Sequence, residues 1–432
     1  MKKILIKNGT LVDPKKGTWS ETDVLTEDGV IRRVGPGMAD PAAQVINASG
    51  LLVGPGFINL HVHLREPGEE WKEDLYSGSR AAAKGGFTSV VCLANTKPPL
   101  DSPLVLRALR ARIQEVGRVH IFPAAAITRG LEGKAMTEFG FLKEAGAVVL
   151  SDDGQGVTDS RVLYQARTYA RYFDLPGLLH EEDGRLSGEG QVHDGPVAVQ
   201  MGLKPIPRVA EDSIMARDLV LALSTGARTH FTHLSTAFSV ELLTWFQKKG
   251  ALVSADVTPH HLLLTDEVVR EKGTLAKVKP PLREKSDIIA LKDGLRTGVI
   301  GILASDHAPH TREEKEGDFT EAPFGISNLE ITCPLLVKAL LDDETLDWPG
   351  LWRALSDTPD RFLHLFNKGS IEEGKDADVT IVDPGTEWDV DVTSFESRGK
   401  NCPFDGWTLR GWPVYTMVGG KMVMSERSII GE

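Results

Sequence analysis

Residues 57–78, FINLHVHLREPGEEWKEDLYSG, contain the stretch that decides the fold. An apolar run ends in two histidines, His61 and His63, and Arg65 follows two positions later. Alternate side chains of a β-strand share a face, so a strand here would direct all three groups to one side. Three basic groups on one face repel each other unless a metal ion or an anion lies opposite. The stretch therefore predicts a strand that ends at a metal or anion site.

Seven further apolar runs of strand length follow this one along the chain. They are residues 87–95, 119–127, 147–154, 176–183, 229–235, 251–261 and 300–310. Amphipathic stretches of helical length lie between them, such as 71–86, which ends in two glycines, and 211–226, which ends in one. Eight strand–helix units predict a parallel sheet covered by helices, and eight is the number that closes a barrel. We therefore predict an α/β fold, a (β/α)8 TIM-type barrel. The alternative is an open doubly wound sheet, but no GxGxxG or P-loop motif follows any of these strands.

The two ends of the chain resemble each other. Short predicted strands of alternating apolar and polar residues, separated by Gly and Pro, occupy the first fifty residues. The same pattern returns after about residue 365. We expect the two ends to pair in one small β-sandwich domain, formed by residues 1–54 and 366–432, beside a barrel formed by residues 55–365.

The composition narrows the class of protein. The 432 residues are 41% hydrophobic, which is ample for a large core. A net charge of -12 without a basic cluster argues against nucleic acid as a partner. No apolar run approaches the ~20 residues that cross a bilayer, and no signal-peptide core is present. Three cysteines (Cys92, Cys333 and Cys402) without CxxC spacing favour a reducing compartment. We expect a cytoplasmic protein that binds no membrane.

Imidazole and carboxylate groups gather at the ends of the predicted strands, where barrel enzymes build their active sites. They are His61, His63, Asp152, Asp153, His180, His233 and Asp306. Any one of them alone would be an ordinary core histidine or a turn or capping aspartate. Their joint placement favours a metal site, and these ligand types suit Zn as well as Mn, Fe or Co. Five or six ligands exceed the three that a single catalytic zinc keeps, so two metal ions are favoured.

Other histidines also follow predicted strands. His260 and His261 follow the seventh strand, and His307 and His310 follow the eighth. Adjacent strand residues point in opposite directions, so His307 should face away from Asp306. We expect His307 and one member of the His260/His261 pair to be structural.

Several motifs together resemble those of the long bacterial dihydroorotases, a family of the amidohydrolase superfamily. They include HVHLREPG (61–68), LANTKPPLD (93–101), SDDG (151–154), VTPHHL (257–262), SDHAPH (305–310) and APFGI (322–326). The resemblance extends over nearly the whole chain in the same order. It implies a zinc-dependent cyclic amide hydrolase that reversibly closes N-carbamoyl-L-aspartate to L-dihydroorotate in de novo pyrimidine (UMP) biosynthesis. It further implies a homodimer, with possible association with aspartate carbamoyltransferase.

The resemblance also implies roles for individual residues. His61, His63 and Asp306 would bind one zinc ion, and His180 and His233 a second. Asp153 would bridge the two ions, since the fourth strand has no lysine at its end to carry a carbamate. Asp306 would also transfer the proton during catalysis. The implied substrate contacts are His63, Arg65, Asn95, Lys279, His310, Phe324 and Gly325. Lys279 stands where the family has asparagine, so an ammonium group would replace the amide as the donor to a ring carbonyl oxygen.

One long charged segment, residues 311–325, follows the eighth strand. A long loop at the active face of a barrel is usually functional. Because the segment has few apolar groups with which to anchor itself, we expect it to be mobile without substrate and ordered with it.

Two rival functions stay open. Allantoinases and hydantoinases share the barrel, but their neutral substrates have no carboxylate for Arg65 to bind. A silent homologue that serves only as a partner of aspartate carbamoyltransferase would have lost metal ligands, and none of the six is missing here.

Overall fold

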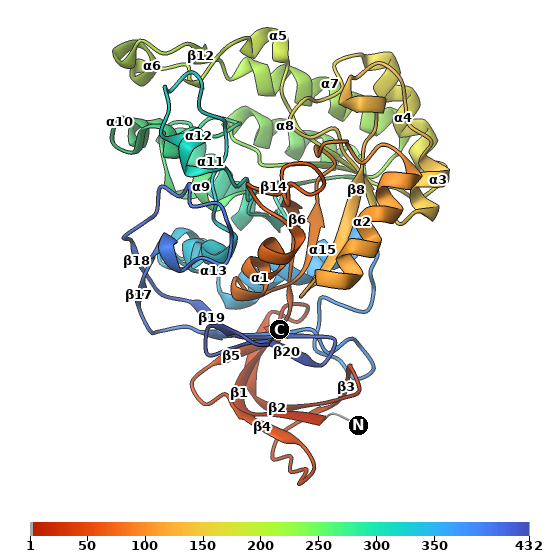
Figure 1. Cartoon of the computed structure of the whole chain (residues 1–432), viewed down its shortest axis with the longest axis vertical. Coiled ribbons are helices and arrows are strands. Elements are labelled where there is room, and N and C mark those ends of the chain that lie inside the picture. Colours follow the sequence, from red (N-terminus) through yellow and green to blue (C-terminus); the bar gives the residue numbers. More distant parts are fainter. Residues whose placement is uncertain (1–2, 432) are drawn as a thin grey trace.

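A computed structural model of the chain describes residues 3–431 (Figure 1). Its centre is a sheet of eight strands in which every neighbouring pair is parallel and follows chain order. The strands are β6 (Phe57–Val62), β7 (Phe87–Cys92), β8 (His120–Ala125), β9 (Val149–Leu150), β10 (Gly177–Leu179), β13 (Thr229–Phe231), β14 (Val253–Val257) and β15 (Ile302–Leu303). Each lies inside one of the eight predicted runs.

The sheet closes on itself just beyond its last strand. Val62 and His307 form a parallel bridge, and the amide of His63 donates to the carbonyl of His307 at 2.9 Å. The first and last strands are thereby joined, so the sheet is a barrel and the open doubly wound alternative is excluded. The predicted (β/α)8 architecture is confirmed.

Helices surround the barrel and connect its strands (Figure 1). The longer ones are α1 (Leu75–Lys84), α2 (Pro103–Val116), α4 (Ser160–Tyr172), α7 (Val209–Thr225), α8 (Ala237–Lys248) and α11 (Lys285–Arg296). Shorter ones are α3 (Phe139–Glu144), α5 (Gly184–Ser187), α6 (Pro196–Met201), α9 (Pro259–Leu263), α10 (Val269–Lys272), α12 (Arg312–Lys315), α13 (Thr332–Leu336), α14 (Trp348–Trp352) and α15 (Thr358–Leu363). Helix α1 begins at Asp74, whose carboxylate accepts from the amide of Ser77 at 2.7 Å, and ends at Gly85. Helix α7 ends at Gly226, which is left-handed at φ 62°. Both ends agree with the sequence pattern.

The chain ends form a second, nine-stranded sheet below the barrel in Figure 1. Its strands are β1 (Lys3–Asp13), β2 (Thr18–Glu27), β3 (Val30–Gly35), β4 (Gln44–Asn47), β5 (Leu52–Pro55), β16 (Val379–Asp383), β19 (Trp412–Val418), β20 (Lys421–Ser425) and β21 (Ser428–Ile429). Strand β5 pairs antiparallel with β16, so that Val53 lies opposite Ile381. Both side chains are buried in one apolar cluster with Ile4, Ile6 and Val379. The two ends therefore build one β domain, as the repeated strand pattern predicts. Two further short pairs of strands, β11 (Val192–His193) with β12 (Pro205–Ile206) and β17 (Trp388–Asp389) with β18 (Thr408–Leu409), lie outside both sheets.

The interior of the barrel is apolar at its floor and polar at its rim, where the carboxyl ends of the strands lie. Buried side chains of successive strands fill the floor, among them Ile58, Leu60, Val91, Leu178 and Ile302. The histidines and aspartates of interest lie at the opposite, carboxyl ends of the strands. Within residues 3–431, no helix is both long and apolar enough to cross a membrane.

Candidate metal centre and substrate pocket

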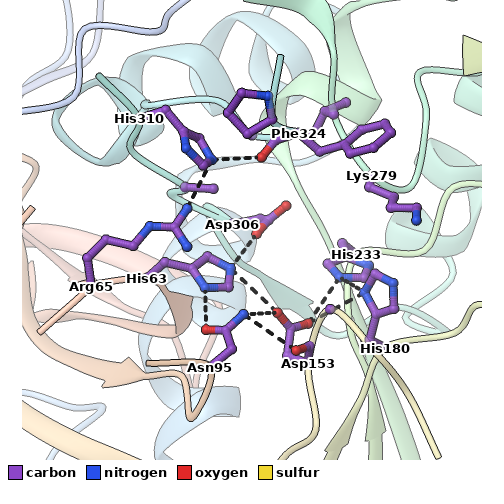
Figure 2. Close-up of a pocket in the computed structure, with 15 residues that line it drawn as sticks. His63, Arg65, Asn95, Asp153, His180, His233, Lys279, Asp306, His310 and Phe324 are labelled. Atoms are coloured by element: carbon purple, nitrogen blue, oxygen red, sulfur yellow. Dashed lines mark hydrogen bonds and ion pairs between the residues drawn. The ribbon is translucent and has the colours of Figure 1, made fainter. Parts of the chain in front are cut away.

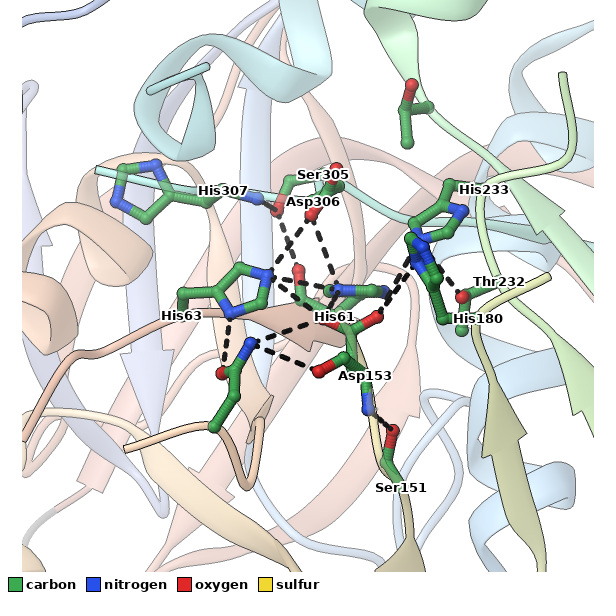
Figure 3. Close-up of polar contacts among 12 residues, drawn as sticks. His61, His63, Ser151, Asp153, His180, Thr232, His233, Ser305, Asp306 and His307 are labelled. Carbon is green, nitrogen blue, oxygen red and sulfur yellow. Dashed lines mark hydrogen bonds and ion pairs between the residues drawn. The ribbon is translucent and has the colours of Figure 1, made fainter. Parts of the chain in front are cut away.

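Strands β6, β9, β10, β13 and β15 contribute to one cluster of buried imidazoles and carboxylates, which Figure 3 shows. His61 lies on β6, and the other members lie just beyond the ends of β6, β9, β10, β13 and β15: His63, Asp153, His180, His233 and Asp306. All six side chains are buried. The cluster unites the six metal ligands that the family resemblance implies, whereas the seventh strand-end residue, Asp152, lies outside it.

One half of the cluster is built around Asp306. The Nε2 atoms of His61 and His63 lie 3.3 Å apart, and each is 3.3 Å from Asp306 Oδ1. Two ring nitrogens and a carboxylate oxygen that converge in this way form a donor set for a cation (Figure 3).

The other half is built around His180 and His233. His180 Nδ1 lies 3.0 Å from His233 Nε2, and these atoms lie 3.5 and 3.7 Å from Asp153 Oδ1. The second oxygen of Asp153, Oδ2, lies 3.5 Å from both His61 Nε2 and His63 Nε2. Asp153 thus presents one oxygen to each half, which is the arrangement a bridging carboxylate requires.

The electrostatics of the cluster fit a cation. Burial alone would raise the pKa of Asp153, but the charge of His61 and the nearby rings of His180 and His233 hold that pKa well below its ordinary value. The pKa of Asp306 is likewise lowered despite burial, chiefly by His61 and His63. Both carboxylates are therefore ionised. Asp153 Oδ1 is buried without a hydrogen-bond partner in the described chain. An ionised oxygen without a hydrogen-bond donor is best explained as a metal ligand.

Neighbouring groups fix the orientation of the candidate ligands. His63 Nδ1 contacts Asn95 Oδ1 at 3.0 Å, and His180 Nε2 contacts Glu182 Oε2 at 3.2 Å. The amide of His233 donates to Asp256 Oδ1 at 2.7 Å and holds a left-handed residue at φ 41°. Such partners set the tautomer and direction of a metal-binding imidazole.

A cavity of about 320 Å³ opens above the cluster (Figure 2). Its volume lies in the range of small-molecule sites. All seven predicted substrate contacts line it: His63, Arg65, Asn95, Lys279, His310, Phe324 and Gly325. The candidate ligands Asp153, His180, His233 and Asp306 line it too. A ligand in this cavity would lie directly against the metal centre.

Arg65 and His310 form one end of the cavity. Arg65 Nε donates to the carbonyl of Pro309 at 3.2 Å. His310 Nε2 lies 3.1 Å from Arg65 Nη2 and 2.9 Å from the carbonyl of Phe324. This nitrogen either accepts from the guanidinium or donates to the carbonyl. Burial and the charge of Arg65 lower the pKa of His310, so its ring is neutral.

Lys279 lies on the opposite side of the cavity (Figure 2). Its Nζ is 2.9 Å from Glu182 Oε1 and 5.1 Å from the centre of the Phe324 ring. The ammonium group is thus partly neutralised by a carboxylate that also contacts His180. Lys279 reaches the cavity, but with a charge partner of its own.

The remaining strand-end residues lie outside the cluster. His307 Nε2 faces Glu73 Oε2 at 3.4 Å, away from Asp306 as predicted. His261 contacts Thr258 and the carbonyl of Pro280. Asp152 accepts from the amides of Ile127 and Thr128. All three therefore stabilise loops.

Sequence reasoning missed the groups behind the ligands. Glu182 and Asp256 orient His180 and His233, as described above, and Asn401 supports the far wall of the cavity. Glu182 carries a weak signal, because it follows His180 by two positions. Asp256 and Asn401 carry none, because their partners lie at least 23 residues away in the sequence.

Comparisons with known proteins agree with this geometry. A family model described as dihydro-orotase-like matches residues 50–239. A dihydroorotase of Pelotomaculum thermopropionicum is 45% identical over 427 residues, which cover 99% of this chain and 100% of the relative. A dihydroorotase of Citrifermentans bemidjiense is 43% identical over 97% of this chain and 99% of the relative.

The chain belongs to the dihydroorotase family.

Solved structures of related enzymes share the fold. The L-hydantoinase (dihydropyrimidinase) of Arthrobacter aurescens superposes with a TM-score of 0.90 at 25% identity and covers 100% of this chain and 98% of its own. A D-hydantoinase (dihydropyrimidinase) of a Thermus species gives 0.85 at 25% identity, over 99% and 97%. Membership of the dihydroorotase family and this likeness make the chain a cyclic amide hydrolase of the metal-dependent amidohydrolase type. The predicted family and enzyme class are confirmed.

Proposed function

We propose that this protein is a zinc-dependent dihydroorotase. It would interconvert N-carbamoyl-L-aspartate and L-dihydroorotate in de novo pyrimidine biosynthesis. The family relationship supports the reaction class, and one observation about the cavity supports the substrate. That observation is a guanidinium group, Arg65, beside the metal centre.

Arg65 has no carboxylate within ion-pair distance among the described residues. Its side chain contacts the carbonyl of Pro309 and the ring of His310, and it lines the cavity. A half-buried guanidinium without an anion favours an anionic ligand, and its planar shape matches a carboxylate. Dihydroorotate carries a carboxylate on the ring that is opened, whereas hydantoin and dihydrouracil carry none.

The metal centre would hold two zinc ions. His61, His63 and Asp306 would bind one ion, His180 and His233 the other, and Asp153 both. When bound, the ions would supply a nucleophilic water at neutral pH and polarise the ring amide carbonyl. The protein groups would hold the substrate so that this carbonyl lies at the metal centre, with its carboxylate toward Arg65, Asn95 and His310.

Asp306 would transfer the proton. Its depressed pKa keeps it ionised, so it can accept the proton of the attacking water. It would then deliver this proton to the ring nitrogen as the carbon–nitrogen bond breaks. In the direction of ring closure the same carboxylate would remove the proton from the ureido nitrogen. The main chain at Phe324 and Gly325 would lie against the ring, and Lys279 could donate to its remaining carbonyl oxygen.

The hydantoinase reading is the second candidate, favoured by the likeness to the Arthrobacter aurescens structure. A comparison of substrates separates the two. The purified protein should open L-dihydroorotate with a kcat/KM about 10- to 100-fold higher than that for dihydrouracil or hydantoin, because only dihydroorotate gains a charge-assisted contact of about 1.5–3 kcal/mol. A preference for either neutral ring would overturn the substrate assignment. A folded protein that opens none of these rings, even with zinc added, would support the silent-partner alternative.

We also propose the finer features that the resemblance implies. The protein would be a cytoplasmic homodimer, would act on a small-molecule substrate, and could associate with aspartate carbamoyltransferase. Its domains would be residues 1–54 with 366–432, and residues 55–365.

A further inference from the structure

A segment near the end of the chain reaches the rim of the barrel. Residues 397–402 belong by sequence to the part that returns to the β domain, yet they pack against the loops that follow β15. Ser397 Oγ donates to Glu73 Oε2, a carboxylate that also faces His307. Asn401 lies further along the segment, and its side chain is only 3% exposed.

Asn401 uses every side-chain position for hydrogen bonding. Its Oδ1 accepts from the amide of His310 at 3.0 Å and from Ser327 Oγ at 2.7 Å. Its Nδ2 donates to the carbonyls of Ala308 and Gly325, both at 3.0 Å. A primary amide offers two donor and two acceptor positions, and all four are satisfied. Its main-chain carbonyl also accepts from the amide of Ser327 at 2.9 Å.

These contacts tie together the two segments that form one wall of the cavity. Residues 307–310 and 324–327 lie side by side, since the amide of Ala308 donates to the carbonyl of Ile326 at 3.0 Å. Ala308, His310 and Gly325 all line the cavity. Asn401 itself is not among the described residues that line it, so it lies behind this wall and does not reach the ligand.

The wall that Asn401 supports is the one that faces Arg65. His310 Nε2 contacts Arg65 Nη2 (Figure 2), and the carbonyl of the preceding Pro309 accepts from Arg65 Nε. The position of the guanidinium therefore depends on residues 309 and 310, and that of residue 310 depends on Asn401. A fully satisfied buried amide has one favourable geometry, so it holds these loops in a single arrangement.

We propose that Asn401 is a positioning residue for recognition of the substrate carboxylate. It acts through His310 and Gly325, fixing the distance between the loops and thereby the placement of Arg65. Few other residues could do this. Aspartate would lack both donors and serine would make at most part of the set, while glutamine is longer by one methylene. The proposal deepens the proposed function and rests on it.

The test is a comparison of Asn401→Ala with the wild type and with Thr416→Val. Thr416 is a matched control, because it is fully buried in β19 and its hydroxyl donates to the carbonyl of Ala83 far from the cavity. For Asn401→Ala we expect KM for dihydroorotate to rise by roughly 10- to 100-fold, the size expected for an error of about 1 Å in position. The value of kcat should change less than KM, and the zinc content should equal that of the wild type. Thr416→Val should lose stability without a change in KM.

A neutral ligand provides a readout that a purely structural role would not move. Dihydrouracil as a competitive inhibitor should bind Asn401→Ala and the wild type within about threefold, because it makes no contact with the guanidinium. Should Asn401→Ala fail to fold, Asn401→Asp carries the same test, since it keeps both acceptor contacts and loses both donors. An unchanged KM in either folded variant would overturn the proposal. So would equal losses for dihydroorotate and dihydrouracil, or a loss of zinc. A wild type that does not act on dihydroorotate would instead refute the proposed function.

Discussion

The backbone conformation of Arg65 and the contacts of its side chain both set the position of the guanidinium. Its φ of 59° lies in the left-handed region, which few residues other than glycine adopt. His233 and Asp306 share this conformation, at 41° and 46°. An unfavourable backbone conformation at three candidate site residues is typical of sites where side-chain direction matters more than local stability.

Replacement of Arg65 tests this role directly. Arg65→Met keeps the length and the apolar stem but removes the guanidinium. We expect kcat/KM for dihydroorotate to fall by one to two orders of magnitude, since a hydrogen-bonded contact to a carboxylate contributes about 1.5–3 kcal/mol. Steady-state kinetics with both dihydroorotate and dihydrouracil measure the effect.

Two controls accompany this variant. The zinc content of Arg65→Met should match the wild type, because Arg65 is not a candidate ligand, and turnover of dihydrouracil, where detectable, should change much less. Equal losses with the charged and the neutral ring would mean that Arg65 has only a structural role.

The candidate ligands were predictable from the sequence because each lies at or just beyond the carboxyl end of a barrel strand, and these ends share one face of the barrel. For this reason the structure brings all six candidate ligands together: His61, His63, Asp153, His180, His233 and Asp306. The simple alternation of a strand did not apply throughout. Strand β6 ends at Val62, so His63 and Arg65 reach the site from an irregular loop.

At the scale of elements, the loop of residues 311–325 has anchoring contacts that the sequence does not indicate. The sequence predicts a mobile segment because few apolar side chains could anchor it. The structure anchors it with two buried lysines instead. Lys277 Nζ donates to the carbonyls of Phe319 and Ala322, and Lys315 Nζ donates to those of Thr274 and Pro323. Lysine is normally exposed, so neither the composition nor the periodicity of the segment indicates this role.

The buried ammonium of Lys315 makes stability depend on pH. Burial and the nearby charge of Lys277 lower its pKa from 10.5 to about 7, although Glu314 opposes the shift. Between these two values the unfolded chain holds a proton that the folded chain has released, so stability rises with pH. The free energy of unfolding of the wild type, minus that of Lys315→Met, should therefore increase from about pH 7 to pH 9.5. Urea unfolding at four pH values measures the difference.

The hydrogen bonds of Lys315 also predict where the loop opens. In Lys315→Met at pH 7.5, amide hydrogen exchange should accelerate in residues 316–324. It should stay unchanged in α7, to which the Lys315 ammonium makes no hydrogen bond. A constant stability difference across the pH range would show that Lys315 does not titrate as stated. Unchanged exchange in the loop would show that other contacts anchor it.

At the scale of the whole molecule, the sequence predicts the count of barrel strands but not every connection between distant segments. Eight apolar runs and two similar chain ends are visible in the pattern. The closing bridge between Val62 and His307 is not, because it lies beyond the last strand in irregular backbone. The return of Asn401 to the rim of the barrel is also not visible in the sequence. No local pattern identifies a hydrogen-bond partner 76 residues away, such as Gly325.

The candidate metal ligands come from five strands, so a metal ion that they bind should stabilise the entire barrel. A ligand that binds only the folded state stabilises it by about 2.7 kcal/mol at a concentration of 100 times its Kd. Removal of metal with a chelator should therefore lower Tm by several degrees and abolish turnover, and added zinc should restore both. Scanning calorimetry and metal analysis follow the change.

Asp153→Ala serves as the control, because loss of the bridge should leave it with less metal, no turnover and a smaller response to the chelator. The metal assignment would be overturned if the wild type lost its metal to the chelator and kept its Tm and its activity. The bridging role would be excluded if Asp153→Ala kept its full metal content and the wild-type rate.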